Sequence, residues 1–153
     1  MAKEKNLGFR ISKLEDLGYT FQKPDESIAT ERINFSMETN IDLNPKHDKF
    51  SFILKPRFTT GKKNPKLIAE LIFRIEFDFQ ELKSVLIKES EDTFTLPDQL
   101  IVTLFSISYS TMRGVFFEKS RGTMAERLIL PIIDPAGILQ RGESLQEDSK
   151  TKY

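Results

Sequence analysis

The sequence predicts an α+β domain in which a four-stranded antiparallel sheet packs on one long helix and a short C-terminal helical segment follows. Two observations support this fold class. Apolar and polar residues alternate over several long stretches, and alternation places successive side chains on opposite faces of a strand. A later stretch repeats its apolar residues every three or four positions, which is typical of a helix with one buried face.

The clearest alternation lies in residues 33–43 and 67–79. The odd positions in both stretches are nearly all apolar, whereas polar and charged residues fill many of the even ones. One covered face and one wet face are typical of an antiparallel sheet that is packed on a single side. We therefore expect Phe73, Ile75 and Phe77 to be buried, and Arg74, Glu76 and Asp78 to be exposed.

Two further strands are expected on either side of residues 33–43. Residues 7–21 alternate in two phases, and the slip between Leu14 and Gly18 predicts a bulge or a bend. The other strand runs from Phe50 to Phe58 and carries Pro56 in phase. Because proline has no N–H to donate to a ladder, this strand is predicted to be an edge strand or to be bulged at Pro56. Turn-forming residues at 44–48 and 60–65 predict hairpin connections.

The long helix is predicted from about Pro97 to Lys119. Proline suits the first turn of a helix, and one apolar stripe follows at helical spacing. The β-branched residues and a local alternation around Ile107 would also fit a strand, but the length of the segment favours a helix. Apolar residues occupy most of the helix circumference. This predicts a second covering layer from a partner subunit, in a homodimer or a homotetramer.

Composition excludes several classes of function. The chain has 23 Lys and Arg against 23 Asp and Glu, so no net field favours nucleic acid or anionic lipid. It has no cysteine, which excludes disulfides and Cys-based zinc sites and fits a cytoplasmic protein. No run is expected to approach the roughly 20 apolar residues of a membrane-spanning helix, so no integral membrane segment is predicted. The 13 Phe fit either core packing or an apolar binding surface.

The sequence offers no convincing catalytic constellation. His47 is the only histidine and lies in a predicted turn, where a solvated side chain is the usual state. Ser106, Ser108 and Ser110 have no histidine near them in sequence and no nucleophile elbow. Glu76 and Asp78 would share a wet strand face, where alternating charges are expected without catalysis. We expect no enzyme activity, no metal and no cofactor.

The order and size of these elements resemble the SecB family of protein-export chaperones, and three segments add to the resemblance. They are Phe9-Arg-Ile-Ser-Lys-Leu-Glu-Asp-Leu-Gly-Tyr-Thr-Phe-Gln-Lys-Pro24, which resembles the family's opening strand, Ser120-Arg-Gly-Thr123 after the long helix, and Leu130-Pro-Ile-Ile-Asp134, which resembles a Leu-x-Pro-x-Asn segment. The resemblance extends from about Leu7 to Leu139. It implies one domain over residues 1–139, and the polar composition of residues 140–153 predicts a loose tail.

The resemblance implies an ATP-independent chaperone, a holdase, that binds unfolded or extended polypeptides through exposed apolar grooves. Apolar residues that flank the long helix are the candidate groove walls, although capping of the core explains each of them equally well. The candidates are Leu82, Val85, Leu86, Phe94, Ile132, Ile133, Ile138 and Leu139.

The sequence departs from the family on the sheet face that docks on the translocation motor SecA. Two first-strand positions that are acidic in the family correspond to Gly18 and Gln22, and only Glu70 keeps an acidic side chain. The resemblance therefore leaves two roles open, preprotein export with SecA as partner or a chaperone attached to a toxin–antitoxin pair. The alternative is a structural or adaptor protein that keeps the fold and the oligomer but binds no client.

Overall fold

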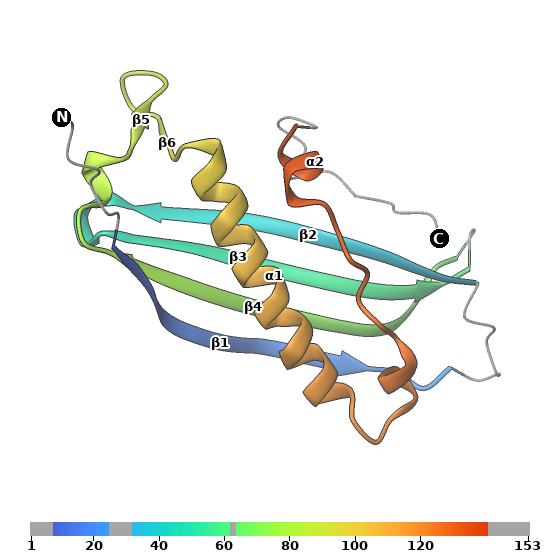
Figure 1. The fold of residues 1–153 in the computed structure, drawn as a ribbon. Helices are drawn as coiled ribbons and strands as arrows, with labels where there is room; N and C mark the ends of the chain where they lie inside the picture. Colours follow the sequence, from blue (N-terminus) through green and yellow to red (C-terminus); the bar gives the residue numbers. More distant parts are fainter. Residues whose placement is uncertain (1–7, 25–31, 62–63, 141–153) are drawn as a thin grey trace.

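Four long strands form one antiparallel sheet in the computed structural model, which describes residues 8–24, 32–61 and 64–140. The strands are β1 (Phe9–Phe21), β2 (Ile33–Asn44), β3 (Lys49–Thr60) and β4 (Lys66–Phe79), in the spatial order β1-β4-β3-β2. Figure 1 shows helix α1 (Asp98–Ser120) crossing one face of the sheet obliquely. We call this face the inner face and the opposite one the outer face. The predicted fold class is confirmed.

Short elements connect and follow these five. A 3-10 turn, η2 (Pro45–His47), joins β2 to β3, and η3 (Leu82–Ser84) follows β4. A small hairpin of β5 (Ile87–Lys88) and β6 (Phe94–Thr95) precedes α1. After α1 come η4 (Met124–Arg127), an extended stretch and α2 (Pro135–Gln140). The predicted loose tail begins inside α2 at Gln140, and the rest of it lies outside the described residues.

Helix α1 begins and ends within one residue of the predicted limits. Pro97 is the N-cap, and Asp98 in the first turn complements the helix dipole. Gly122, shortly after the helix, has a φ of 78°, a left-handed conformation that glycine adopts without strain. Hydroxyl groups along α1 donate to the carbonyl four residues earlier, so a helix rich in Ser and Thr satisfies these donors internally. The donors are Thr103, Ser106, Ser108 and Thr111.

Aromatic rings hold α1 on the inner face. Phe105 contacts Phe52 of β3 with ring centroids 5.6 Å apart, and Phe116 contacts Phe58 at the same separation. The buried residues of the helix recur at three- and four-residue spacing and form one stripe. Phe73, Ile75 and Phe77 lie beneath this layer and are almost fully buried, as predicted. The core therefore lies between the inner face and one side of α1.

The prediction that Pro56 marks an edge strand is wrong, because β3 lies inside the sheet between β4 and β2. Pro56 pairs with Met37 of β2, while the paired residues of β3 and β4 skip Lys55 and Pro56. The missing N–H is thus accommodated by a short gap in one ladder. The register shift of β3 comes two residues later, between Phe58 and Thr59.

Strand β1 contains two bulges. One lies between Asp16 and Gly18, inside the predicted interval, and is closed by a hydrogen bond from the Gly18 N–H to the Asp16 carboxylate at 3.1 Å. The other, between Ile11 and Lys13, was not predicted. Each bulge adds one residue and so moves the apolar residues that follow back to the inner face.

Helix α1 is long and apolar enough, by length and composition alone, to cross a membrane. The helix passes this test although Ser, Thr and Gly interrupt its apolar residues, and the expectation of no integral membrane segment stays a prediction. About a third, 33%, of this apolar stretch is buried inside the protein.

Replacing Phe105 by alanine should destabilise the fold by about 3–5 kcal/mol, because its ring is buried between α1 and β3 and the cavity would not fill. Phe117→Ala, in an exposed position of the same helix, is the matched control and should cost under about 0.5 kcal/mol. Urea unfolding followed by circular dichroism at one protein concentration measures both. Equal losses would contradict the packing of α1 described above.

Candidate functional site

No reactive cluster stands out among residues 8–24, 32–61 and 64–140. These ranges contain no group of three or more His, Asp or Glu residues that could hold a metal ion. His47 is exposed in η2, and the hydroxyls of Ser106 and Ser108 bond to helix carbonyls. What the described structure offers instead is two kinds of surface, a network of ion pairs and a set of exposed apolar side chains.

Ion pairs cover the outer face of the sheet. Lys49 Nζ lies 2.8 Å from Glu76 Oε1 and 3.4 Å from Asp78 Oδ1, and it links β3 to β4. Arg57 Nε of β3 lies 2.7 Å from Glu70 Oε2 of β4. These contacts leave the charged side chains of β4 half-buried rather than exposed, which corrects the prediction for Arg74, Glu76 and Asp78. Their mutual packing removes much of their surface from water.

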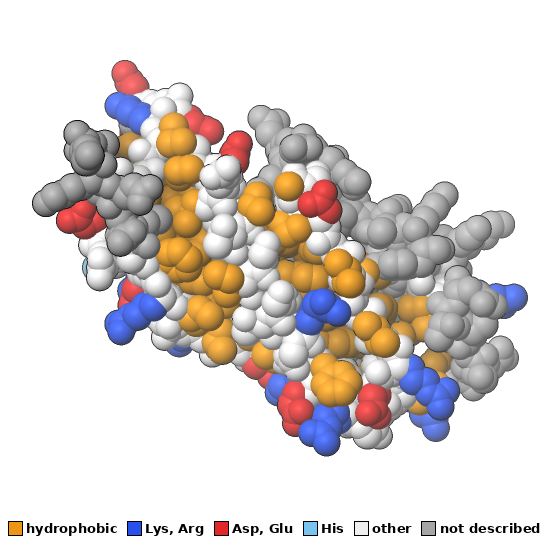
Figure 2. Space-filling model, in the orientation of Figure 1, with side chains coloured by type: hydrophobic (Ala, Val, Ile, Leu, Met, Phe, Trp, Pro, Cys, Tyr) orange, Lys and Arg blue, Asp and Glu red, His pale blue; other side chains and the backbone are white. Residues whose placement is uncertain are grey.

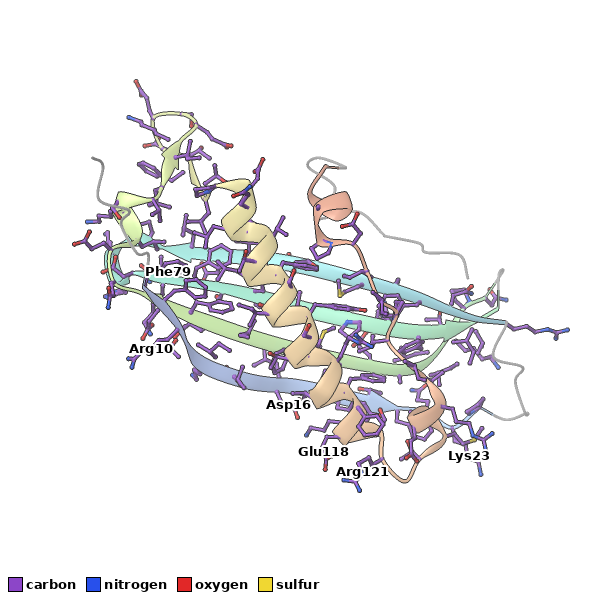
Figure 3. The ribbon with its side chains drawn as sticks, in the orientation of Figure 1. Arg10, Asp16, Lys23, Phe79, Glu118 and Arg121 are labelled. Atoms are coloured by element: carbon purple, nitrogen blue, oxygen red, sulfur yellow. The ribbon has the colours of Figure 1, made fainter. Side chains whose placement is uncertain are left out.

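Three carboxylates of β1 and β4, Asp16, Glu76 and Asp78, have a pKa below the usual value. A hydrogen bond from Lys49 lowers the pKa of Glu76 below its usual 4.5, with a further hydrogen bond from Ser12 at 3.1 Å, and these outweigh the opposing effect of partial burial. A hydrogen bond from Lys119 lowers the pKa of Asp16. Figure 3 shows Asp16 on β1 beneath the C-terminal half of α1, so this pair ties the end of the helix to the edge strand.

A shallow cavity of about 490 Å³ opens at the end of the sheet where Arg10 and Phe79 meet (Figure 3). Its charged groups are already engaged. Arg10 and Lys49 both pair with Asp78, and Asp48 accepts a hydrogen bond from the Leu82 N–H at 3.1 Å. The cavity therefore presents no free catalytic pair. Its lining residues are Gly8, Phe9, Arg10, His47, Asp48, Lys49, Asp78, Phe79 and Gln80.

The candidate groove residues before α1 divide between core and surface. Leu82 is completely buried, so it belongs to the core. Val85 and Leu86 are half-buried and pack against that core. Only Phe94, on β6, presents a large part of its ring to solvent, with an exposed fraction of 44%.

The candidates after α1 divide in the same way. Ile132 is 88% exposed, whereas its neighbour Ile133 is half-buried against the core. Ile138 and Leu139 lie in α2, and their side chains fall outside the described residues. Figure 1 places β6 and the stretch that contains Ile132 on opposite sides of α1. The structure therefore does not bring Phe94 and Ile132 together as walls of one groove.

Sequence reasoning missed other exposed apolar side chains. On β1, Ile11 and Leu14 pair with Phe77 and Ile75, so they belong to the inner face, yet about half of each side chain is exposed. The change of phase in the alternation along β1 shows which residues belong to the inner face. It does not show whether a helix covers that strand, so the exposure of Ile11 and Leu14 could not be predicted from it. A second group lies at the end of α1 and beyond it, and comprises Phe117, Met124 and Ile129.

Residues 128–134 form an extended stretch beside α1, which we call the connecting segment. Leu130 is buried in the core, and the Tyr109 hydroxyl of α1 donates to the Pro131 carbonyl at 2.5 Å. These two contacts hold the segment against the helix and the inner face. Ile129, 77% exposed, and Ile132 point to solvent instead and are the two most exposed large apolar side chains of the described residues. Figure 2 shows apolar side chains gathered in several bands over the face that carries α1.

Comparison with known proteins gives a distant likeness of fold. No protein-family model matches the chain, and no curated protein matches it in sequence. Among solved structures, it is similar to the SecB-like chaperone Rv1957 of Mycobacterium tuberculosis, solved with a ChAD peptide from the HigA1 antitoxin, with 13% identity and a TM-score of 0.48 over 82% of this chain and 88% of that one. It is also similar to a protein of unknown function from Streptococcus agalactiae, with 9% identity and a TM-score of 0.36 over 83% and 95%.

The ion pairs of the outer face should make the fold sensitive to acid. Because the folded pKa of Glu76 is lower than its unfolded value, its contribution to stability is complete above about pH 4.5 and is lost as pH falls through the folded pKa. Urea unfolding between pH 7 and pH 3 should therefore depend less on pH in Glu76→Gln than in the parent. Glu118→Gln, which removes an exposed pair with Arg121, is the control. Parallel pH profiles for the parent and Glu76→Gln would contradict the role of Glu76.

Proposed function

We propose that this protein is an ATP-independent chaperone that holds unfolded or extended polypeptides, with no catalytic activity of its own. The observation that carries the proposal is the exposure of Ile129 and Ile132 on a segment that is anchored to the core. Exposed apolar side chains that lie close together on a well-anchored segment suit a binding surface, because contiguous apolar patches of soluble proteins often serve interactions. The resemblance of the sequence to SecB supports the same function.

An unfolded chain offers apolar side chains and unpaired main-chain groups, and the described inner side of this protein offers partners for the first of these. Its exposed apolar residues come from several elements around α1, including β1, the β5–β6 hairpin and the connecting segment. A client can therefore contact several small apolar areas instead of one deep pocket. Such a surface accepts many sequences, as a holdase requires.

Besides the unfolded client, two kinds of partner are considered, the translocation motor SecA and an antitoxin. Glu70, the one acidic position kept for docking on SecA, is already paired with Arg57 and only slightly exposed. A motor that docks there would have to share or displace this pair, at a cost in electrostatic energy. We therefore favour a client class outside general export, such as the extension of an antitoxin, over preprotein export with SecA.

We also propose that the protein assembles as a homodimer or a homotetramer through the flank of α1 next to β1. Leu100, Ile107 and Val115 recur at spacings of seven and eight residues and share the flank that is turned away from Tyr109 and the connecting segment. We take this flank together with the exposed Ile11 and Leu14 as the proposed interface and call it the apolar shelf. A second copy can cover it by placing its own shelf opposite. The two bulges and the inward-facing Asp16 make pairing along the whole of β1 less suitable.

The double substitution Ile129→Ser with Ile132→Ser should weaken binding of a permanently unfolded protein, such as reduced and carboxymethylated α-lactalbumin, by about 10-fold or more. Each apolar side chain contributes roughly 1.5–3 kcal/mol when fully buried. The melting temperature should stay near that of the parent, since both side chains are exposed before binding. Isothermal calorimetry without nucleotide measures the affinity, and circular dichroism measures the melting.

Ile133→Ser is the matched control, because its side chain packs against the core; it should lower the melting temperature. If the parent neither binds the unfolded protein nor suppresses aggregation of a denatured enzyme without ATP, the chaperone proposal fails and the structural or adaptor role becomes preferred. If the folded double variant binds the unfolded protein as tightly as the parent does, Ile129 and Ile132 are not part of the binding surface.

Leu14→Glu should dissociate the oligomer, because it places a charge on the apolar shelf. Ile87→Glu is the control, since Ile87 on β5 is equally exposed but lies outside the shelf. Light scattering at micromolar concentration should give a multimer for the parent and for Ile87→Glu, and a smaller species for Leu14→Glu. A monomeric parent at that concentration would contradict the assembly.

A further inference from the structure

Arg113 of α1 is the one half-buried basic side chain on the inner side of the described structure. The other half-buried basic side chains of residues 8–24, 32–61 and 64–140 belong to β3 and β4 and lie among the charges of the outer face; they are Lys49, Lys55, Arg57 and Arg74. Within the same ranges, no carboxylate pairs with Arg113 and no hydrogen bond involves its guanidinium. Its positive charge is therefore uncompensated on a surface that is mainly apolar.

The guanidinium of Arg113 reaches water, although the side chain as a whole is half-buried. In the described part of the chain, the buried side-chain nitrogen and oxygen atoms without a hydrogen-bond partner belong to Arg57, Arg74 and Asp78. None belongs to Arg113, so its nitrogens keep their contact with solvent. Its methylene groups can meanwhile lie along apolar neighbours. Arginine stays protonated in proteins and carries five N–H donors, which leaves Arg113 ready for an anionic ligand.

Arg113 lies on the flank of α1 that faces the connecting segment. It follows Tyr109 by four residues, which corresponds to about 6 Å along the helix and about 40° around it. Tyr109 donates to Pro131, and Figure 1 shows the connecting segment running back beside α1 from η4. The part of the segment before Pro131 therefore passes the turn that contains Arg113. Because helical side chains lean toward the N-terminus of their helix, the guanidinium lies at the level of Ile129 and Ile132.

We propose that Arg113 pairs with a carboxylate of the bound client, so that this surface selects extended polypeptides in which an acidic residue lies next to apolar ones. This inference rests on the proposed chaperone function and names its class of client. A guanidinium forms two parallel hydrogen bonds with a carboxylate. Client side chains on Ile129 and Ile132 exclude water around that pair, and the lower local dielectric strengthens its attraction. Arg113 is already half-buried, so only part of its hydration is lost on binding.

The selection has to come from this local charge. Basic and acidic residues balance over the whole chain, 23 against 23, so no net field draws an acidic client to the protein. A basic residue elsewhere on the surface should therefore not replace Arg113. Arg127 in η4 provides the matched control, because it is exposed and carries the same charge.

Two peptides that differ in one side chain test the selection. Both consist of alternating leucine and threonine with lysines at the ends, and one central threonine is replaced by glutamate in the first and by glutamine in the second. In calorimetry at low ionic strength, the parent should bind the glutamate peptide about 5-fold more tightly than the glutamine peptide. Arg113→Gln should bind the two peptides equally, whereas Arg127→Gln should keep the preference of the parent.

Circular dichroism checks that both variants fold. The inference is overturned if folded Arg113→Gln keeps the preference, or if both variants lose it equally, since the cause is then the overall charge. The comparison of the two peptides on the parent needs no variant: equal binding of both would also overturn the inference, while the chaperone function would stand. If neither peptide nor the unfolded α-lactalbumin binds the parent, both proposals fail.

Discussion

A single helix has to cover one face of a four-stranded sheet, and it is too narrow to do so. The strands lie about 4.8 Å apart, whereas a helix with its side chains is about 10 Å across. The aromatic contacts place α1 over β3, where Phe105 and Phe116 contact Phe52 and Phe58. Tyr19 of β1 reaches Phe116 only near the end of the helix. The inner side of the molecule therefore depends on other segments to complete the layer.

The two flanks of α1 solve this problem differently. On one side the connecting segment packs on the sheet, places Leu130 in the core and completes the layer with an extended chain. On the other side Ile11 and Leu14 of β1 have no covering element among the described residues and remain half exposed. The outer face needs no cover, because the ion pairs between β3 and β4 fill it with charged groups that compensate one another. Exposed apolar side chains therefore lie mainly on the inner side of the sheet and on the segments that pack over it.

The sequence predicted the sheet, the helix and the buried face of β4 because each depends on a local period. Phe73, Ile75 and Phe77 alternate strictly, and one residue of slip would have reversed their faces. Pro56 was misplaced because spatial strand order is not a local property: β3 became central through pairing with residues far along the chain. The half-burial of Glu76 was missed for a similar reason, since its partner Lys49 belongs to another strand.

The candidate site was predicted less well, because exposure depends on what packs above a residue. Leu82 and Ile132 look alike in sequence, as apolar residues next to a helix, yet one is fully buried and the other almost fully exposed.

A chaperone without nucleotide hydrolysis can release its client only through the binding equilibrium, so each of its contacts has to be weak. The exposed side chains that we propose as the client-binding surface suit that requirement. Two exposed isoleucines on the connecting segment, Ile129 and Ile132, offer a small contact, far from the area of a stable protein–protein interface. Assembly would repeat the contact on each subunit, and a long unfolded chain could occupy several copies at once. Retention would then come from the number of contacts and release from the weakness of each.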